Sequence, residues 1–130
     1  MAKKEKSLKP TEAELEVLQV LWSEGASTVR FVHEKINETK EVGYTTTLKI
    51  LQNMLEKGLV MRDEQSRTHI YKAAVAEQDI QKKLLDRFLE TTFGGSALKL
   101  VMQALGNNTT TQDELAQIRE FLNEKEGGKK

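Results

Sequence analysis

The sequence contains no cysteine, which removes disulfide bonds, thiolate metal sites and thiol nucleophiles together. Histidine is scarce as well, because only His33 and His69 are present. They fall in different predicted elements, and neither has a partner at the spacing of metal ligands. We therefore expect no metal site and no bound cofactor.

The glycine-rich motifs of common enzyme families are also missing. The pair Gly94-Gly95 has no predicted strand before it and no Lys-Ser or Lys-Thr after a second glycine, so it is not a phosphate-binding loop. No Gly-x-Ser-x-Gly segment is present to carry a nucleophilic serine. We expect that the chain is not an enzyme and assign no catalytic residue.

Long apolar segments and an excess of charge of one sign are absent. No apolar run approaches the roughly 18–20 residues of a membrane span, and the lysine-rich first nine residues lack the apolar middle of a secretory signal. The sequence thus predicts a cytoplasmic protein without membrane insertion. Twenty basic and twenty acidic residues cancel, so the overall charge does not indicate a nucleic-acid binder and the local distribution must decide.

The first half of the chain has the apolar spacing of three helices. These are predicted over about 11–23, 28–38 and 45–57. Thr11 followed by Glu14 is the signature of a capping box at the first helix. Ser27 and Thr45 are the expected N-caps of the second and third helices. Trp22 and Phe31 are expected to complete the small core that these helices share.

Two short strands are predicted after the third helix, at about 59–62 and 68–72, around a polar turn. Three helices followed by a hairpin is the layout of a winged helix-turn-helix, in which the third helix enters the major groove and the hairpin, the wing, lies along the DNA backbone. A plain helical core with an incidental hairpin has the same layout. We predict a mainly α fold with a small β-hairpin: a DNA-binding domain over 8–75 and a helical dimerisation region over 76–126.

Local charge favours the DNA-binding interpretation. Residues 11–41 hold three basic and seven acidic side chains, whereas residues 42–72 hold five basic and three acidic ones, and residues 1–9 hold four lysines and one glutamate. The positive charge therefore lies in the segments that would face phosphates.

The outward face of the third helix is expected to carry the DNA contacts, since its side chains form hydrogen bonds and few are carboxylates. The predicted DNA-binding residues are Tyr44, Thr45, Thr46, Lys49, Gln52 and Asn53 on the helix, with Arg62 and Arg67 on the wing. Some of them could instead be solvated or capping residues, and Tyr44 could simply pack at the helix start.

Three more helices are predicted in the tail: one over about 77–92, a short one capped by Ser96, and a last one that begins with a capping box of Thr111 and Glu114. About fifty residues cannot bury so much apolar surface alone. The residues predicted to form the dimer interface are Ile80, Leu84, Phe88, Leu89, Leu98, Val101, Met102, Leu105, Leu115, Ile118 and Leu122. Alternatively, these helices fold back onto the winged helix of the same chain.

Two segments carry a resemblance to a known family. They are Leu8-Lys9-Pro10-Thr11-Glu12-Ala13-Glu14-Leu15-Glu16-Val17-Leu18 with Trp22, and Gly43-Tyr44-Thr45-Thr46-Thr47-Leu48 through Leu55-Glu56-Lys57-Gly58-Leu59-Val60. In this order they resemble the penicillinase-repressor family, the BlaI/MecI/CopY type of winged-helix regulators. The stretch 67–71 is similar to the family's wing and the helical tail to its dimerisation region.

The resemblance implies a homodimeric transcriptional repressor that binds double-stranded DNA at a palindromic operator. In several members a membrane-bound metalloprotease sensor, triggered by a β-lactam, inactivates the repressor, so antibiotic-resistance or stress genes are the implied targets. The chain lacks the paired C-terminal cysteines of the copper-responsive members. Its segment 98–105 also lacks the Asn-Phe bond that is cleaved in staphylococcal members.

Release from DNA by proteolysis is our hypothesis, with the glycine-flanked segment from Gly94 to Asn108 as the cut region. A short helix between glycine breaks has low local stability, and cutting the tail would remove the avidity of two linked DNA-binding modules. A protein-interaction module that uses the winged helix only as a scaffold is the alternative. Steep salt dependence of binding to duplex DNA would separate the two.

Overall fold

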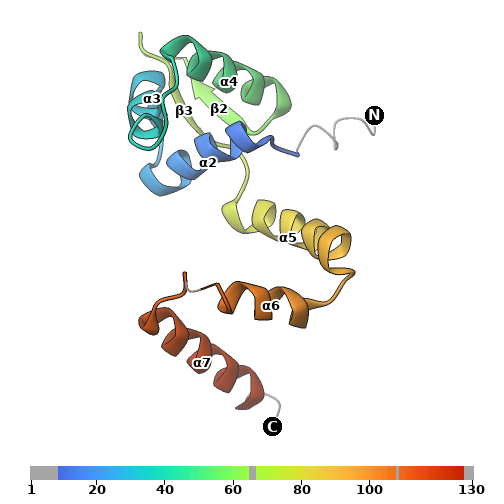
Figure 1. The fold of residues 1–130 in the computed structure, drawn as a ribbon. Coiled ribbons are helices and arrows are strands. Elements are labelled where there is room, and N and C mark those ends of the chain that lie inside the picture. The colour runs from blue at the N-terminus through green and yellow to red at the C-terminus, as the bar shows by residue number, and fades with distance from the viewer. Residues whose placement is uncertain (1–8, 65–66, 108, 128–130) are drawn as a thin grey trace. The chain divides into compact units, whose positions relative to one another are not determined.

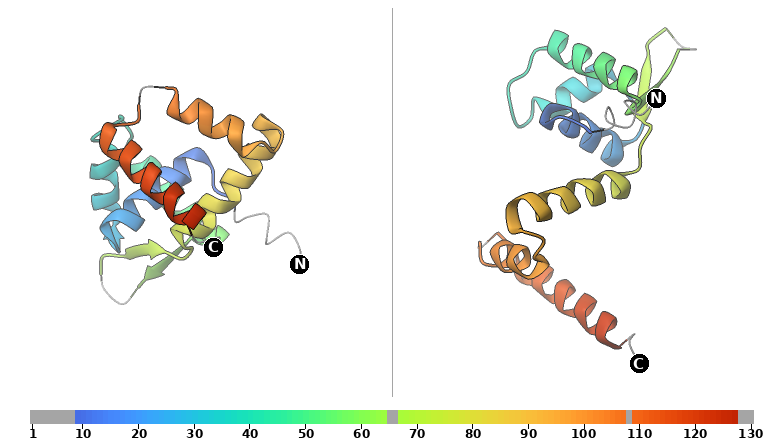
Figure 2. Two further views of the ribbon diagram at one scale, coloured as in Figure 1. Left: turned by 90° about the horizontal axis from the view of Figure 1, so that it is seen from below. Right: turned by 90° about the vertical axis from the view of Figure 1, so that its right-hand side faces the viewer.

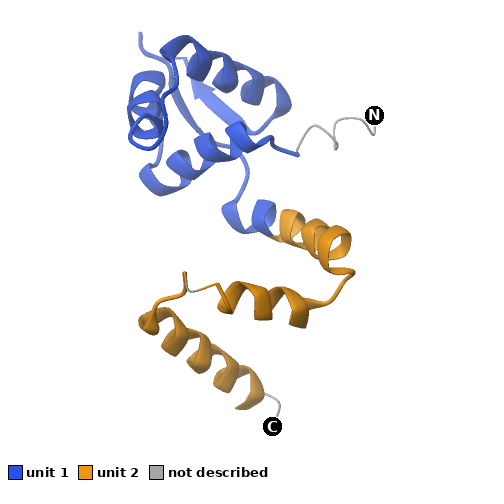
Figure 3. Cartoon of the chain, in the orientation of Figure 1, with its two compact units in different colours: residues 1–81 blue, residues 82–130 orange. Residues whose placement is uncertain are grey.

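The chain forms two compact units in the computed structural model, which describes residues 9–64, 67–107 and 109–127. The units comprise residues 1–81 and 82–130 (Figure 3). The predicted domain boundary between residues 75 and 76 lies shortly before this division. The predicted domain start at Leu8 and the end of the predicted cut region at Asn108 lie outside the described residues.

The first unit begins with helices α2 (Glu12–Glu24), α3 (Val29–Ile36) and α4 (Tyr44–Lys57), close to the predicted ranges (Figure 1). The capping box of α2 is confirmed: the Thr11 hydroxyl accepts a hydrogen bond from Glu14 N at 3.1 Å, and Thr11 N donates to Glu14 Oε1 at 2.9 Å. The predicted N-cap of α3 is wrong. Thr28 rather than Ser27 caps that helix, since its hydroxyl accepts from Phe31 N at 3.1 Å.

A three-stranded antiparallel sheet completes the unit, where the sequence predicted a two-stranded hairpin. Strands β2 (Val60–Asp63) and β3 (Ile70–Ala73) form that hairpin, which projects beyond the helices in Figure 2. The additional strand β1 (Ser27–Thr28) pairs with the other edge of β3. Two residues are too few to produce an alternating pattern, so β1 could not be predicted from the sequence. Three helices with this hairpin form a winged helix-turn-helix.

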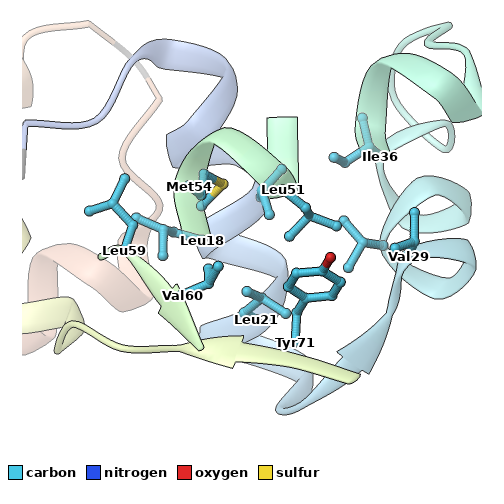
Figure 4. Close-up of a cluster of buried hydrophobic side chains, with 11 residues drawn as sticks. Leu18, Leu21, Val29, Ile36, Leu51, Met54, Leu59, Val60 and Tyr71 are labelled. Atoms are coloured by element: carbon cyan, nitrogen blue, oxygen red, sulfur yellow. The ribbon is translucent and has the colours of Figure 1, made fainter. Parts of the chain in front are cut away.

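One apolar core joins these elements, and Figure 4 shows side chains from α2, α3, α4 and the strands converging on it. Leu18, Leu51 and Leu59 have no exposed surface, and Tyr71 of β3 is 1% exposed. Trp22 packs against this core, as predicted. Phe31 does not: it is 37% exposed on the outer side of α3, because Val29 and Val32 already occupy the buried face of that short helix.

Two local contacts fix how the chain leaves α4 and the sheet. Gly58 ends α4 in the left-handed conformation (φ 86°, ψ 15°), which lets Leu59 N donate to Met54 O at 2.9 Å and turns the chain into β2. After β3, the indole Nε1 of Trp22 donates to Val75 O at 3.0 Å. These contacts bind the wing's two ends to the helical core.

The tail consists of α5 (Glu77–Phe93), which begins in the first unit, α6 (Ala97–Leu105) and α7 (Gln112–Gly127). The predicted caps are confirmed, since Ser96 caps α6 and Thr111 forms a capping box with Glu114. Within the described residues, no pair among these three helices makes an extensive contact. No helix in that part of the chain is long and apolar enough to cross a membrane.

The core predicts a clear difference between two aliphatic truncations. Leu51→Ala should lower the free energy of unfolding by about 2–5 kcal/mol, because it leaves a cavity at a fully buried position. Met61→Ala is the control, since Met61 is 49% exposed and its loss should change that free energy by no more than about 0.5 kcal/mol. Urea denaturation at one fixed protein concentration measures both. Equal midpoints for the two variants would contradict this description of the core.

Candidate nucleic-acid interface

The orientation of α4 follows from its buried face. Thr47, Leu51 and Met54 are fully buried and lie at the i, i+4, i+7 spacing of one helix side. Since these residues pack into the core, the opposite side of α4 must face solvent. The sequence predicted this division, and the structure has it.

Five of the six predicted α4 residues are polar side chains exposed on that outer side: Thr45, Thr46, Lys49, Gln52 and Asn53. The sixth, Tyr44, is 47% exposed at the helix start. Glu56 is also exposed one helical turn beyond Gln52, so the face ends on a carboxylate that sequence analysis did not assign to it. The first three turns of this face therefore offer hydrogen-bond donors and acceptors without a negative charge.

The predicted role of Thr45 as N-cap is wrong. The helix begins at Tyr44, and Gly43 is its N-cap, with no side chain to accept a hydrogen bond. Thr45 is thus the second residue of α4, and its hydroxyl is available on the exposed face. Propensity favoured threonine as the cap, but the extended conformation of Gly43 (φ −75°, ψ 155°) starts the helix earlier.

The turn between α3 and α4 is held by a set of hydrogen bonds on Val42. Asn37 Nδ2 donates to Val42 O at 2.9 Å, and Val42 N donates to Asn37 Oδ1 at 3.1 Å. Nε2 of His33 lies 2.9 Å from the same carbonyl oxygen, and the rings of His33 and Tyr44 form a T-shaped pair with centroids 5.6 Å apart. These contacts fix the start of α4 relative to α3. Asn37 is not among the residues predicted from the sequence, although an asparagine after a helix is a common turn residue.

The far end of α4 is tied to the start of α2. Lys57 Nζ donates to Glu14 Oε1 at 2.7 Å, and the Glu14 side chain is only 6% exposed. The same carboxylate oxygen closes the capping box at Thr11 N. One buried acidic group thus links the end of α4 to the start of α2.

On the wing, Arg62 is engaged within the chain. Its Nε and Nη2 donate to Glu64 Oε2 at 3.0 Å and 2.6 Å. The hydrogen bond from Arg62 lowers the pKa of the Glu64 carboxyl, and the Glu64 partner raises the pKa of Arg62. Arg62 therefore reaches a phosphate only by sharing or exchanging a carboxylate partner.

Arg67 lies beyond this pair and is exposed. It takes part in no ion pair among the residues that the structure describes. The two predicted wing residues thus differ, since Arg62 is bound by Glu64 and Arg67 presents its guanidinium to solvent.

The predicted dimerisation residues differ in exposure within one chain. Exposed ones are Phe88 (47%), Leu98 (71%), Val101 (46%), Met102 (64%) and Leu122 (52%). Half-buried ones are Leu84, Leu89, Leu105, Leu115 and Ile118. Ile80 is 4% exposed, so the single chain already covers it and it is not part of the exposed apolar stripe.

No group of three or more histidine, cysteine, aspartate or glutamate side chains that could hold a metal ion occurs among the described residues. The candidate site is thus a surface built by a helix and a hairpin, with hydrogen-bonding groups on the helix and guanidinium groups on the wing. Such a surface is suited to contacts with base edges and phosphates.

Known proteins resemble this chain over most of its length. The family model of the penicillinase repressor matches residues 10–124. The transcriptional regulator BlaI of Mycobacterium tuberculosis is 30% identical over 117 residues, which cover 86% of this chain and 81% of that protein. The methicillin resistance regulatory protein MecI of Staphylococcus aureus (strain N315) is 25% identical over 120 residues, or 92% of this chain and 98% of MecI.

A solved structure shows the same fold at low identity. The complex structure of hsRosR-S4, from the H. salinarum protein RosR, matches with a TM-score of 0.55 and 17% identity, covering 98% of each chain. Because the repressor family model spans the winged helix and the tail together, the chain belongs to the penicillinase repressor family.

Proposed function

We propose that the chain is a homodimeric transcriptional repressor that binds a palindromic DNA operator through α4 and the β2–β3 wing. The observation that carries this proposal is the division of α4 into a fully buried apolar side and an exposed side of hydrogen-bonding residues. Lysine can donate to guanine, and glutamine and asparagine can pair with adenine, so this side can read bases in the major groove. Membership of a family of repressors supports the same conclusion.

The proposed dimer follows from the apolar surface of the tail. Helices α5, α6 and α7 expose large apolar side chains. Among the described residues, no two of these helices pack extensively against each other. Apolar surface of this kind on a soluble domain commonly marks a protein interface. Two winged helices must also lie about one DNA turn apart, roughly 34–36 Å or a multiple of it, to read a palindrome.

The proposal also includes the regulated genes and the way in which the repressor is released from DNA. The relatives are named for penicillinase and methicillin resistance, which makes antibiotic-resistance genes the first candidates. Helix α6 has no buried residue and follows Gly94 and Gly95, both with positive φ, so it is the proposed cut region for a membrane sensor metalloprotease. Cleavage there would separate the DNA-binding modules and abolish their avidity.

The assigned roles on DNA predict two different mutant phenotypes. After selection of bound fragments from the source genome, Lys49→Ala should cost about 1–3 kcal/mol on the selected operator and relax preference at one base position. Arg67→Ala should weaken binding to all sequences alike and lower the salt slope by about one unit. Titration of labelled duplexes at several salt concentrations measures both. Equal losses of Lys49→Ala on operator and random DNA would reject its base-reading role.

The dimer proposal predicts that one charge in the tail suffices to disrupt association. Met102→Glu should convert the full-length protein from dimer to monomer at micromolar concentration, because an unpaired carboxylate would be buried in the interface. Sedimentation velocity gives the mass. Glu124→Gln, a change on α7 that adds no buried charge, is the control. A monomeric wild-type chain would contradict the proposal.

The release proposal predicts that induction shortens the protein. Intact-mass analysis of the repressor from induced cells should find fragments ending between Gly94 and Asn107. The double variant Gly94→Ala/Gly95→Ala disfavours the positive-φ turn before α6, so the amount of these fragments should differ from that of the wild type. If derepression occurs with only the full-length chain present, proteolysis is not the release step.

A further inference from the structure

A groove in the first unit lies between the start of α3, the first half of α4 and the wing. Its volume is about 590 Å³, and its lining includes Arg30 of α3, Tyr44 and Leu48 of α4, and Arg67 of the wing. Arg30 is not among the DNA-binding residues predicted from the sequence. Three elements that are distant in sequence thus contribute to one concave surface beside the base-reading side of α4.

The charge of this groove is distinctive. None of its lining residues is acidic, although the chain as a whole has as many acidic as basic residues. Arg30 and Arg67 are both exposed, and within the described part of the chain neither takes part in an ion pair. Asp63 and Glu64 of the adjoining wing segment do not line the groove, and Glu64 is bonded to Arg62. Two guanidinium groups therefore face the groove without a carboxylate between them.

The separation of these two arginines is built into the fold. Thr28, two residues before Arg30, pairs with Ile70 in the sheet, and Ile70 is three residues after Arg67. The groove floor includes Val29 and Tyr71, which are 7% and 1% exposed members of the core. Strand pairing thus holds the start of α3 and the base of the wing over this buried floor, so the backbone segments that carry the two arginines keep a fixed separation.

We propose that this groove binds a backbone phosphate of the DNA, with Arg30 and Arg67 donating to it from opposite walls. Guanidinium groups suit this ligand because they form charge-assisted, fork-shaped hydrogen bonds to phosphate oxygens. Tyr44 belongs both to the groove and to α4, so a duplex whose bases meet Lys49 brings its backbone over the groove. The inference rests on the proposed DNA-binding function and adds α3 to the contact surface.

The ligand is the phosphate of a duplex rather than a free anion. Both arginines are exposed, and exposed charges attract a single mobile anion only weakly at physiological salt. A phosphate in DNA is held in place by its neighbours, and its neutralisation releases condensed counterions.

The test compares Arg30→Gln with Lys35→Gln in the full-length protein. Both variants remove one positive charge from α3, but Lys35 pairs with Glu24 and Glu38 and does not line the groove. Loss of one phosphate contact should reduce the steepness of log K against log salt concentration by about 0.9. At about 0.1 M salt, this corresponds to an affinity about eightfold weaker. Arg30→Gln should show this loss equally on the selected operator and on a random-sequence duplex, with unchanged thermal unfolding. Lys35→Gln should stay close to the wild type.

Three results would overturn the inference. They are equal affinities of the two variants, a loss by Arg30→Gln on the operator alone, and displacement of the duplex by inorganic phosphate at constant ionic strength in the wild type but not in Arg30→Gln. If the wild type binds neither duplex, the proposed function itself fails. If the wild type binds DNA and the two variants behave alike, only the groove assignment fails.

Ethylation of single phosphates locates the contact on the DNA. One ethylated position should weaken wild-type binding and lose its effect in both Arg30→Gln and Arg67→Gln, because both arginines grip the same phosphate. If Arg30→Gln and Arg67→Gln lose sensitivity to ethylation at different phosphates, the two arginines do not share one phosphate and the inference is wrong.

Discussion

The buried side of α4 is the constraint on which the rest of the molecule depends. Thr47, Leu51 and Met54 have no exposed surface, so the helix cannot rotate about its axis without exposing apolar area. The opposite side, with Lys49 and its polar neighbours, is therefore fixed toward solvent. Packing of the buried side in the core thus fixes the orientation of the side that would contact DNA.

Contacts at both ends of α4 reinforce that constraint. At its start, Asn37 and His33 hold the carbonyl of Val42, and at its end Lys57 bonds the buried carboxylate of Glu14. These interactions connect α4 to α3 and α2 respectively. A helix held along one side and at both ends can dock into a groove with little loss of conformational entropy on binding.

Local charge matters more than total charge in this protein. The net charge is zero, yet no acidic side chain lines the groove. On the wing, Glu64 bonds one arginine, Arg62, whereas Arg67 stays exposed. Electrostatic attraction to phosphates acts over about a Debye length of 8–10 Å, so such local arrangements decide the interaction. The tail differs from this surface, because it exposes large apolar side chains that the proposed dimer would cover.

The sequence by itself determined the helices, the hairpin and the outer side of α4, because apolar spacing and capping residues are local signals. It also predicted the capping boxes at Thr11 and Thr111. It failed at Ser27, Thr45 and Phe31, where strand pairing, an extended glycine and a filled core overrode propensity.

Only the tertiary structure decided which distant residues meet. The pairing of Thr28 with Ile70, the bond from Arg62 to Glu64 and the groove shared by Arg30 and Arg67 each depend on the packed arrangement of α3, α4 and the wing. Periodicity reports which side of an element is buried, but it contains no information on the neighbour that covers it. That neighbour is selected by the packing of the whole core.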